Sequence, residues 1–435
     1  MGIENIIFLL LFVTAFVLFA LKIKNIIRNI RLGRDINLNN HFNERLGIMS
    51  RVAIGQSKMV VRPVAGIMHI LIYVGFIIMN IELLEIIIDG IAGTHRIFAF
   101  LGKFYDFVIA SFEFLGLGVL VACIVFLIRR NIIRLKRFWS AEMTAWPRSD
   151  ANLILTIEIF LMTAFFTMNA TDQVLQARGV EHYVQAGSYP ISQYYSTLFT
   201  GLGNETLIAI ERTVWWLHIS GILFFLNYVP YSKHFHILLA FPNVFYSNLN
   251  LKGKFNNMAS VTNEVKLMFD PSAAPPPADG APVKFGAKDV QDLTWKQLMD
   301  AYSCTECGRC TSNCPANITG KKLSPRKIMM DTRDRLEEVG KNLDKKGAEF
   351  TDGKSLLHDY ITSEELWACT TCNACVEACP VNIDPLSIIV DLRRNLVMEE
   401  SNAPAALAGM FTNVENNGAP WQFAQADRLN WANET

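Results

Sequence analysis

Two cysteine runs of the same spacing decide the character of this 435-residue chain. The first is Cys304-Thr305-Glu306-Cys307-Gly308-Arg309-Cys310-Thr311-Ser312-Asn313-Cys314-Pro315, and the second is Cys369-Thr370-Thr371-Cys372-Asn373-Ala374-Cys375-Val376-Glu377-Ala378-Cys379-Pro380. In this pattern three cysteines hold one [4Fe–4S] cluster, and the fourth, followed by proline, ligates a second cluster. The spacing therefore predicts a domain with two [4Fe–4S] clusters.

The same rule predicts which cysteines share a cluster. The first cluster takes Cys304, Cys307, Cys310 and Cys379, and the second takes Cys369, Cys372, Cys375 and Cys314. Zinc is the alternative, because two Cys-x-x-Cys pairs can form a Cys₄ zinc site. The third and fourth cysteines of each run and the prolines favour iron–sulfur clusters.

The ninth cysteine, Cys123, lies in an apolar segment and is expected to be a small buried side chain. No pair of cysteines is left for an obvious disulfide, which predicts a reducing compartment for the thiolate-rich part of the chain. The 40 basic and 40 acidic residues balance, which argues against a nucleic-acid partner.

The first half of the chain is dominated by apolar residues. It contains five hydrophobic stretches, most of them near the roughly 20 residues that a bilayer-spanning helix needs; they cover residues 5–22, 64–89, 106–128, 152–171 and 206–229. Basic residues follow the first stretch instead of preceding it, so we expect a membrane anchor and not a cleaved signal peptide.

Loop charges predict the orientation of these spans. Arginine and lysine are abundant after spans one and three and sparse after spans two and four. By the positive-inside rule the N-terminus lies outside, and the fifth span delivers the cysteine-rich part to the cytoplasm. We therefore expect a multi-pass protein of a bacterial inner membrane, in contact with lipid.

We expect an all-α fold in four parts. Residues 1–230 form a five-helix transmembrane heme b bundle, and residues 231–290 form a membrane-surface segment followed by a Pro/Ala-rich linker at 271–286. Residues 291–400 form a cytoplasmic α-helical ferredoxin domain, with helical signals at 293–299 and from Pro325 to about Leu336. Residues 401–435 form a tail that binds a partner.

The heme prediction begins from histidines in or near the membrane, which usually mark a site. His69 and His236 both lie near the cytoplasmic face and can pair, with His234 as the competing ligand. His218 lies about 12 residues, or ~18 Å, deeper in span five, which disfavours a single heme held by His69 and His218. His95 falls outside the membrane. The alternative is that His234 and His236 are ordinary interfacial histidines.

A resemblance makes the heme prediction specific. The stretches Trp215-Trp216-Leu217-His218 and Tyr228-Val229-Pro230-Tyr231-Ser232-Lys233-His234-Phe235-His236 resemble the last membrane helix of the heme b subunit of respiratory nitrate reductase, and still more the membrane subunits of heterodisulfide reductase. The resemblance implies one or two b-type hemes, with His69, His218 and His236 as ligands.

The sequence differs from the pattern of the nitrate reductase heme b subunit at one position. Met79 stands where the family's second histidine of helix two would fall. An outer heme is then absent, five-coordinate through His218, or ligated by His218 and Met79. Met79 is otherwise a core residue.

Ionisable residues in the outer half of the membrane suggest a quinone site, because quinone chemistry moves protons. Glu211 lies seven residues before His218 and therefore on the same helix face. We expect it near a menaquinone or ubiquinone. The alternative role for Glu211 is an ion pair with a neighbour such as Arg212.

The tail, including Asn416-Asn417-Gly418-Ala419-Pro420-Trp421, resembles the segment that follows the clusters in the heterodisulfide reductase family. No cysteine follows Cys379 within these residues, so we expect a cytoplasmic partner subunit, either a cysteine-rich iron–sulfur protein or a flavoprotein. The sequence thus predicts an electron-transfer subunit that links the quinone pool, heme b, two clusters and that partner. The alternative is a redox-sensing or scaffold subunit without turnover of its own.

Overall fold

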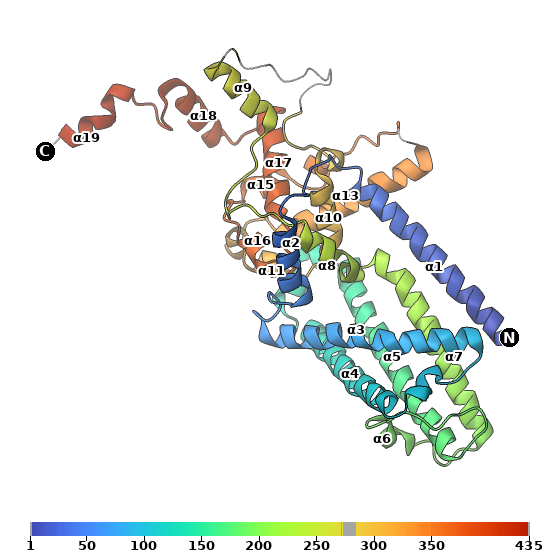
Figure 1. The fold of residues 1–435 in the computed structure, drawn as a ribbon. Coiled ribbons are helices and arrows are strands. Elements are labelled where there is room, and N and C mark those ends of the chain that lie inside the picture. The colour runs from blue at the N-terminus through green and yellow to red at the C-terminus, as the bar shows by residue number, and fades with distance from the viewer. Residues whose placement is uncertain (1, 271, 273–283, 348, 434–435) are drawn as a thin grey trace.

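The computed structural model describes residues 2–270, 272, 284–347 and 349–433. Within these residues it is all-α, with no strand and only two isolated β-bridges. Most of the Pro/Ala-rich linker predicted at 271–286 lies outside the described residues. Figure 1 shows the long helices gathered in one part of the molecule and the shorter ones in another, with the tail helices extending away.

Five long helices form the membrane part: α1 (Ile3–Ile30), α3 (Pro63–Ala92), α4 (Lys103–Leu127), α5 (Trp146–Ala177) and α7 (Asn204–Tyr228). All five are long and apolar enough to cross a bilayer, which confirms the predicted number of spans. Helices α1, α3 and α5 extend beyond both predicted limits, because helical structure continues into the polar residues that flank the apolar run. Helices α4 and α7 begin earlier than predicted and end one residue before the predicted limit.

The five helices pack side by side: α1 contacts α3 and α7, α4 lies between α3 and α5, and α5 packs on α7. The end of the bundle that contains Ile30 and Tyr228 adjoins the cysteine-rich part, and we call it the cluster end. The opposite end, with Ile3 and Asn204, is the distal end. Many apolar side chains of α1 are exposed, as expected for a surface that faces lipid.

The cysteine-rich part consists of short helices around one apolar core. They are α10 (Trp295–Ser303), α11 (Arg309–Ser312), α12 (Pro315–Ile318), α13 (Pro325–Lys346), α14 (Leu356–Asp359), α15 (Ser363–Trp367), α16 (Ala374–Ala378) and α17 (Pro385–Met398). The helix predicted from Pro325 is confirmed, with Ser324 as its N-cap and the proline in the first turn. It extends ten residues past the predicted end at Leu336.

Four further helices lie outside these two groups: α2 (Phe42–Met49), α6 (Ser192–Ser196), α8 (His236–Phe245) and α9 (Ala259–Phe269). The tail carries α18 (Ala405–Asn417) and α19 (Asn430–Asn433). Nine short segments of the described chain have 3₁₀ or π-helical geometry. The π-helical ones are η1 (Ser50–Ile54) and η3 (Ile128–Ile132). The 3₁₀ ones are η2 (Ile97–Leu101), η4 (Lys136–Phe138), η5 (Ala141–Met143), η6 (Val229–Tyr231), η7 (Lys233–Phe235), η8 (Val290–Asp292) and η9 (Gln425–Leu429).

A proline redirects the chain where α7 leaves the bundle. Pro230 has no N–H to continue the helical hydrogen bonds, and α7 gives way to η6 and η7 before α8 begins at His236. Helix α8 packs against α2 and α10, so it lies between the bundle and the cysteine-rich part. His236 therefore stands at the junction of the two parts.

Candidate redox sites

The first cysteine set surrounds a single cavity. Cys304, Cys307, Cys310 and Cys379 all line it, together with Pro380. Cys379 is far from the other three in sequence, so the fold brings together the four thiols that the spacing assigns to one cluster. In the described residues, no three His, Cys, Asp or Glu side chains converge as the ligands of a single ion do. The four cysteines instead line one common cavity.

The thiols of the second set lie near one another. Cys314 and Cys372 are close enough to Cys369 to affect its pKa, and Cys369 and Cys314 affect the pKa of Cys375. Cys375 also affects Cys310 of the first set, so the two sets adjoin, and the interleaved grouping stays a prediction from the spacing. Cys375 is buried, whereas Cys372 is exposed.

The two loops that carry these cysteines fold alike. The second residue after the first cysteine has a left-handed backbone in both, Glu306 at φ 53° and Thr371 at φ 56°. The fourth residue does too, Gly308 at φ 70° and Asn373 at φ 61°. Gly308 suits this conformation, and a Cβ there would lie 2.5 Å from the Arg326 guanidinium.

Burial favours the protonated thiol at two cysteines of the first set. It raises the pKa of Cys304 and of Cys379 from 9 to about 12. Cluster binding therefore displaces protons, because thiolate is the ligating form.

His69 and His236 come together at the cluster end of the bundle. Their ring centres are 6.3 Å apart with the planes at 39°. Two imidazoles that bind a metal from opposite sides, each with its nitrogen about 2 Å away, have ring centres about 6 Å apart. The spacing of this pair therefore fits bis-histidine ligation of one metal.

The other ring nitrogens agree with that fit. His236 Nδ1 lies 3.0 Å from the Lys233 carbonyl oxygen, the kind of contact that orients a ligating histidine and leaves Nε2 for the metal. His69 Nδ1 is buried without a hydrogen-bond partner. The His234 ring lies 5.4 Å from His236, so the competing ligand is also at this site. Burial is the main cause that lowers the pKa of His234 to about 3, and the neighbouring His236 and His69 add to it. The His234 imidazole is therefore neutral.

His218 stands apart from this pair. It is buried in α7, and its Nδ1 lies 3.1 Å from the Leu161 carbonyl oxygen, which again leaves Nε2 as the candidate ligand atom. No aromatic contact among the described residues joins it to another histidine. Met79 packs against the two apolar clusters that contain Leu161 and Ile219, which agrees with its role as a core residue.

An ion pair connects the histidine pair to the first cysteine set. Lys233, whose carbonyl contacts His236, places its ammonium on Glu306, which lies between Cys304 and Cys307. Arg333 binds the other oxygen of Glu306 at 2.9 Å.

A second contact between the two parts comes from the segment before α3. The backbone oxygen of Lys58 accepts a hydrogen bond from Arg309 at 2.8 Å, while the Lys58 ammonium lies 3.3 Å from the Cys379 carbonyl oxygen. The first cysteine set is therefore held against the end of the bundle that carries the histidine pair.

A cavity of about 360 Å³ lies at the distal end, between α1, α3 and α7. Its lining combines aromatic and charged side chains, which include Phe8, Glu85, Asp89, His95, Arg96, Asp172, His182, Glu211, Arg212, Trp215 and Trp216. Glu211, which we predicted to lie near a quinone, lines the cavity. It is also ion-paired with Arg212 at 2.6 Å and accepts a hydrogen bond from Tyr183 at 3.0 Å.

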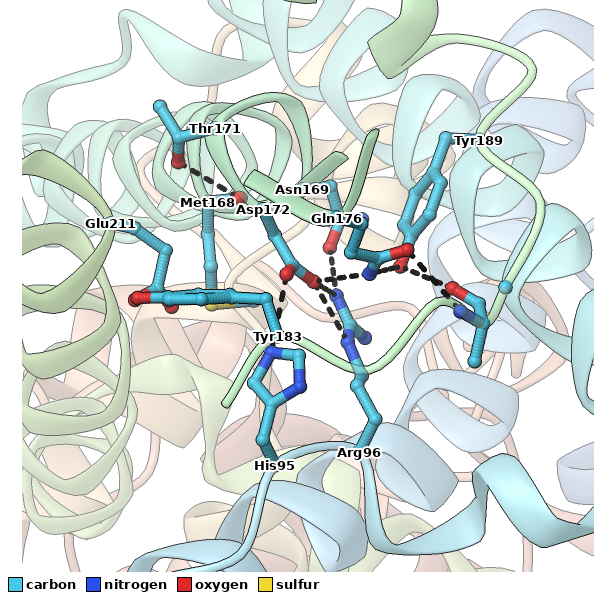
Figure 2. A network of polar contacts seen from close by, with 12 residues as sticks. His95, Arg96, Met168, Asn169, Thr171, Asp172, Gln176, Tyr183, Tyr189 and Glu211 are labelled. Atoms are coloured by element: carbon cyan, nitrogen blue, oxygen red, sulfur yellow. Dashed lines mark hydrogen bonds and ion pairs between the residues drawn. The ribbon is translucent and has the colours of Figure 1, made fainter. Parts of the chain in front are cut away.

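A polar network lies beside this cavity and is drawn in Figure 2. It was not predicted from the sequence. Arg96 donates to Asp172 at 2.9 Å and to Asn169 at 2.8 Å, and His95 lies 3.2 Å from Asp172. The one signal in the sequence was Asp172, an acidic residue near the distal end of span four. Its partners come from a distant loop and could not be inferred from spacing.

Comparison with known proteins identifies the cysteine-rich part. Residues 303–383 match the family of the 4Fe-4S dicluster domain. No solved structure matches the chain.

Two relatives match nearly the whole chain. It is 30% identical over 460 residues to the probable iron-sulfur-binding oxidoreductase FadF of Bacillus subtilis. This alignment covers 98% of this chain and 60% of that protein. It is 27% identical over 426 residues to the EtfAB:quinone oxidoreductase of Syntrophomonas wolfei. That alignment covers 92% of this chain and 55% of that protein. The chain therefore spans little more than half the length of these relatives.

A third relative matches in part. A dihydromethanophenazine:CoB–CoM heterodisulfide reductase subunit of Methanosarcina acetivorans is 31% identical over 147 residues, which is 33% of this chain and 35% of that protein. Homology to a heterodisulfide reductase subunit is thereby confirmed for a third of the chain, whereas the resemblance to the heme b membrane subunit stays a prediction. The chain is a homologue of iron–sulfur oxidoreductases that carries a 4Fe–4S dicluster domain and five helices able to span a membrane.

Proposed function

We propose that this chain is a membrane-anchored electron-transfer subunit that connects a quinone pool with a cytoplasmic oxidoreductase through heme b and two [4Fe–4S] clusters. The observation that carries the proposal is the order of the sites. The first cysteine set adjoins the His69–His236 pair through the Lys233–Glu306 contact, and a cavity with ionisable walls lies at the opposite end of the bundle.

Eight cysteines hold the clusters in this proposal. Cys304, Cys307, Cys310 and Cys379 bind the first, and Cys369, Cys372, Cys375 and Cys314 bind the second. Support comes from the shared cavity of the first set and the mutual charge effects within the second.

His69 and His236 hold heme b at the cluster end, with His234 as the alternative partner. Heme b supplies one-electron redox chemistry inside the membrane. The chain orients the imidazoles, and the Lys233 carbonyl oxygen fixes the His236 ring. His218 is the candidate ligand for a second heme. Glu85 of the distal cavity is 16 residues from His69, or about 24 Å along α3, so a redox group beside His218 would shorten the path between the two ends.

The distal cavity is the proposed site of menaquinone or ubiquinone. Its aromatic walls suit a flat ring, and its charged groups suit a substrate that exchanges protons. The printed name of one relative, EtfAB:quinone oxidoreductase, supports the quinone assignment.

The orientation follows from loop charge, with the N-terminus outside and the clusters in the cytoplasm of a bacterial cell. The proposed parts are residues 1–230 for the membrane domain, 231–290 for the connecting segment, 291–400 for the cluster domain and 401–435 for the partner-binding tail. The partner in this proposal is a flavoprotein or a cysteine-rich iron–sulfur protein, and the relatives that are named as an oxidoreductase and a reductase subunit support a redox partner.

Spectroscopy of the purified full chain tests the proposal. We expect heme absorbance bands that a quinol reduces, together with the electron paramagnetic resonance (EPR) signals of two reduced clusters. His236→Ala should remove or strongly diminish the heme bands, whereas His41→Ala, at a side chain that is 62% exposed on α2's N-cap, should leave them unchanged. The proposed relay is the path of electrons from quinol through heme b to the two clusters. A wild-type chain that carries no heme, or whose heme stays oxidised in the presence of quinol, would refute it.

A further inference from the structure

The distal cavity contains a histidine that the proposed relay does not use. His95 lines the cavity, and its side chain is only 8% exposed. Its Nε2 lies 3.2 Å from Asp172 Oδ1. Its Nδ1 has only a long contact, 3.4 Å from the backbone N–H of Val184. This contact makes Nδ1 the basic nitrogen of the neutral ring, with the proton on Nε2.

The Asp172 carboxylate is fixed so that one oxygen serves His95. Its Oδ2 accepts hydrogen bonds from Arg96 at 2.9 and 3.1 Å and from Gln176 at 3.1 Å. Its Oδ1 has no contact that meets full hydrogen-bond geometry, and it faces the imidazole. Figure 2 shows Arg96 and His95 approaching the carboxylate from the same loop. Arg96 therefore holds Asp172 in place, with the charge of its Oδ1 beside the His95 ring.

Glu211, the carboxylate predicted for this role, is already engaged. Its two oxygens accept hydrogen bonds from the Arg212 guanidinium at 2.6 and 2.8 Å, and one also accepts the Tyr183 hydroxyl. Protonation of Glu211 would remove the charge that holds the Arg212 guanidinium on both oxygens. Protonation of His95 Nδ1 gives up only the long contact with the Val184 N–H.

We propose that His95, beside the Asp172 carboxylate, is the group that exchanges protons with a quinol bound in the distal cavity. The inference rests on the proposed function. In the oxidative direction a quinol O–H bond breaks, its proton passes to His95 Nδ1, and its electron passes into the relay. The second O–H bond breaks in the same way, after His95 has released the first proton to water. Each quinol thus yields one quinone, two electrons and two protons.

The protons leave at the distal surface. Gly2, Glu4 and Thr94 line the cavity and are exposed, so the cavity reaches solvent on the side opposite the clusters. The Asp172 carboxylate stabilises the positive charge that forms on the imidazole, as an oriented carboxylate does beside a catalytic histidine. Quinone reduction uses the same contacts in reverse.

Several charged and titratable groups surround His95 and shape its pH response. They are Asp89 and Glu85 from α3, Arg96 from its own loop, Asp172 from α5, His182 and Tyr183 from the segment after α5, Glu211 and Arg212 from α7, and Glu4 from α1. Burial and the neighbouring His95 lower the pKa of His182. A protonated His95 and a protonated His182 would repel each other.

The experiment measures quinol-driven reduction of the heme and clusters by the full chain in lipid nanodiscs, with a short-chain menaquinol, from pH 5.5 to 8.5. The wild-type rate should rise with pH, because only neutral His95 accepts a proton. His95→Gln should lower the rate about 100-fold and flatten this profile. His41→Gln, on the exposed N-cap residue of α2, serves as the matched control.

Two additional measurements separate chemistry from folding. Cluster EPR signals and dithionite-reduced heme spectra should be the same in wild type and His95→Gln. Added imidazole should restore part of the rate in His95→Ala. Asp172→Asn, which removes only the charge beside the His95 ring, should lower the rate and displace the pH profile.

The outcomes distinguish the inference from the function on which it rests. Wild-type rate and pH profile in His95→Gln would overturn the role of His95 while leaving the relay intact. Loss of the profile in His182→Gln, but not in His95→Gln, would assign the role to His182 and overturn the proposal. A wild-type chain that no quinol reduces would refute both.

Discussion

At the scale of single residues, the two cysteine runs are built from contacts close in sequence, whereas the polar network at the distal end joins residues far apart. Short-range spacing encodes the cluster ligands, because each run folds into one tight loop with left-handed residues at matching positions, such as Gly308 and Asn373. The contact of His95 with Asp172 joins residues 77 positions apart, from a loop and a helix, and no local pattern records it.

Cross-ligation gives a prediction at this scale. Cys379→Ser should remove the first cluster, although Cys379 lies in the second run, because its thiol shares a cavity with Cys304, Cys307 and Cys310. Iron should fall from about eight to about four atoms per chain. The signal of the second cluster should remain in the EPR spectrum.

Cys123→Ser provides the control, since Cys123 is buried in α4 far from both runs in sequence. Its iron content and spectra should match those of wild type. If Cys379→Ser instead removed the cluster of Cys369, Cys372 and Cys375, the interleaved assignment would be wrong.

At the scale of elements, the close packing of α1 on α13 holds the membrane part against the cluster part. Asn29 of α1 is buried, and its amide donates to the Tyr302 hydroxyl at 2.9 Å. A Cβ on Gly340 of α13 would lie 2.4 Å from the Asn29 side chain. The helices themselves were predictable from apolar period and caps, but this contact depends on how two distant elements meet.

Gly340→Ala tests the α1–α13 contact. Inserting a methyl group into a packed contact costs about 1–3 kcal/mol, so the variant should lower the free energy of unfolding despite the better helix propensity of alanine. Differential scanning calorimetry of the detergent-purified chain measures the change as a lower Tm.

Gly409→Ala is the matched control, because Gly409 also lies within a helix, α18, and a Cβ there meets no atom within 4 Å. That substitution should leave Tm unchanged or raise it slightly. Equal Tm values for Gly340→Ala and wild type would mean that Asn29 moves aside at little cost and that the α1–α13 contact is loose.

At the scale of the whole molecule, the fold arranges the candidate sites in sequence from the distal cavity to the second cysteine set. The predicted parts were a bundle and a cluster domain joined by a flexible linker. The observed docking through Lys233, Glu306 and α8 adds a direct contact between them. The sequence could not reveal this docking, since it depends on single long side chains meeting across two separately folded parts.

This order predicts that the two clusters differ in reactivity toward soluble oxidants. Each set has two buried cysteines, but only the second set has an exposed one, Cys372. The first set also contacts the bundle end through Glu306 and the Cys379 carbonyl. A brief pulse of ferricyanide should therefore bleach the second cluster several-fold faster than the first, as followed by freeze-quenched EPR. A docked cytoplasmic partner should slow the loss of the second cluster alone, because in the proposed relay electrons leave the chain at the exposed Cys372. Equal rates for both clusters, or faster loss of the first, would mean that the first set is the one open to solvent and that the relay does not end at the second cluster.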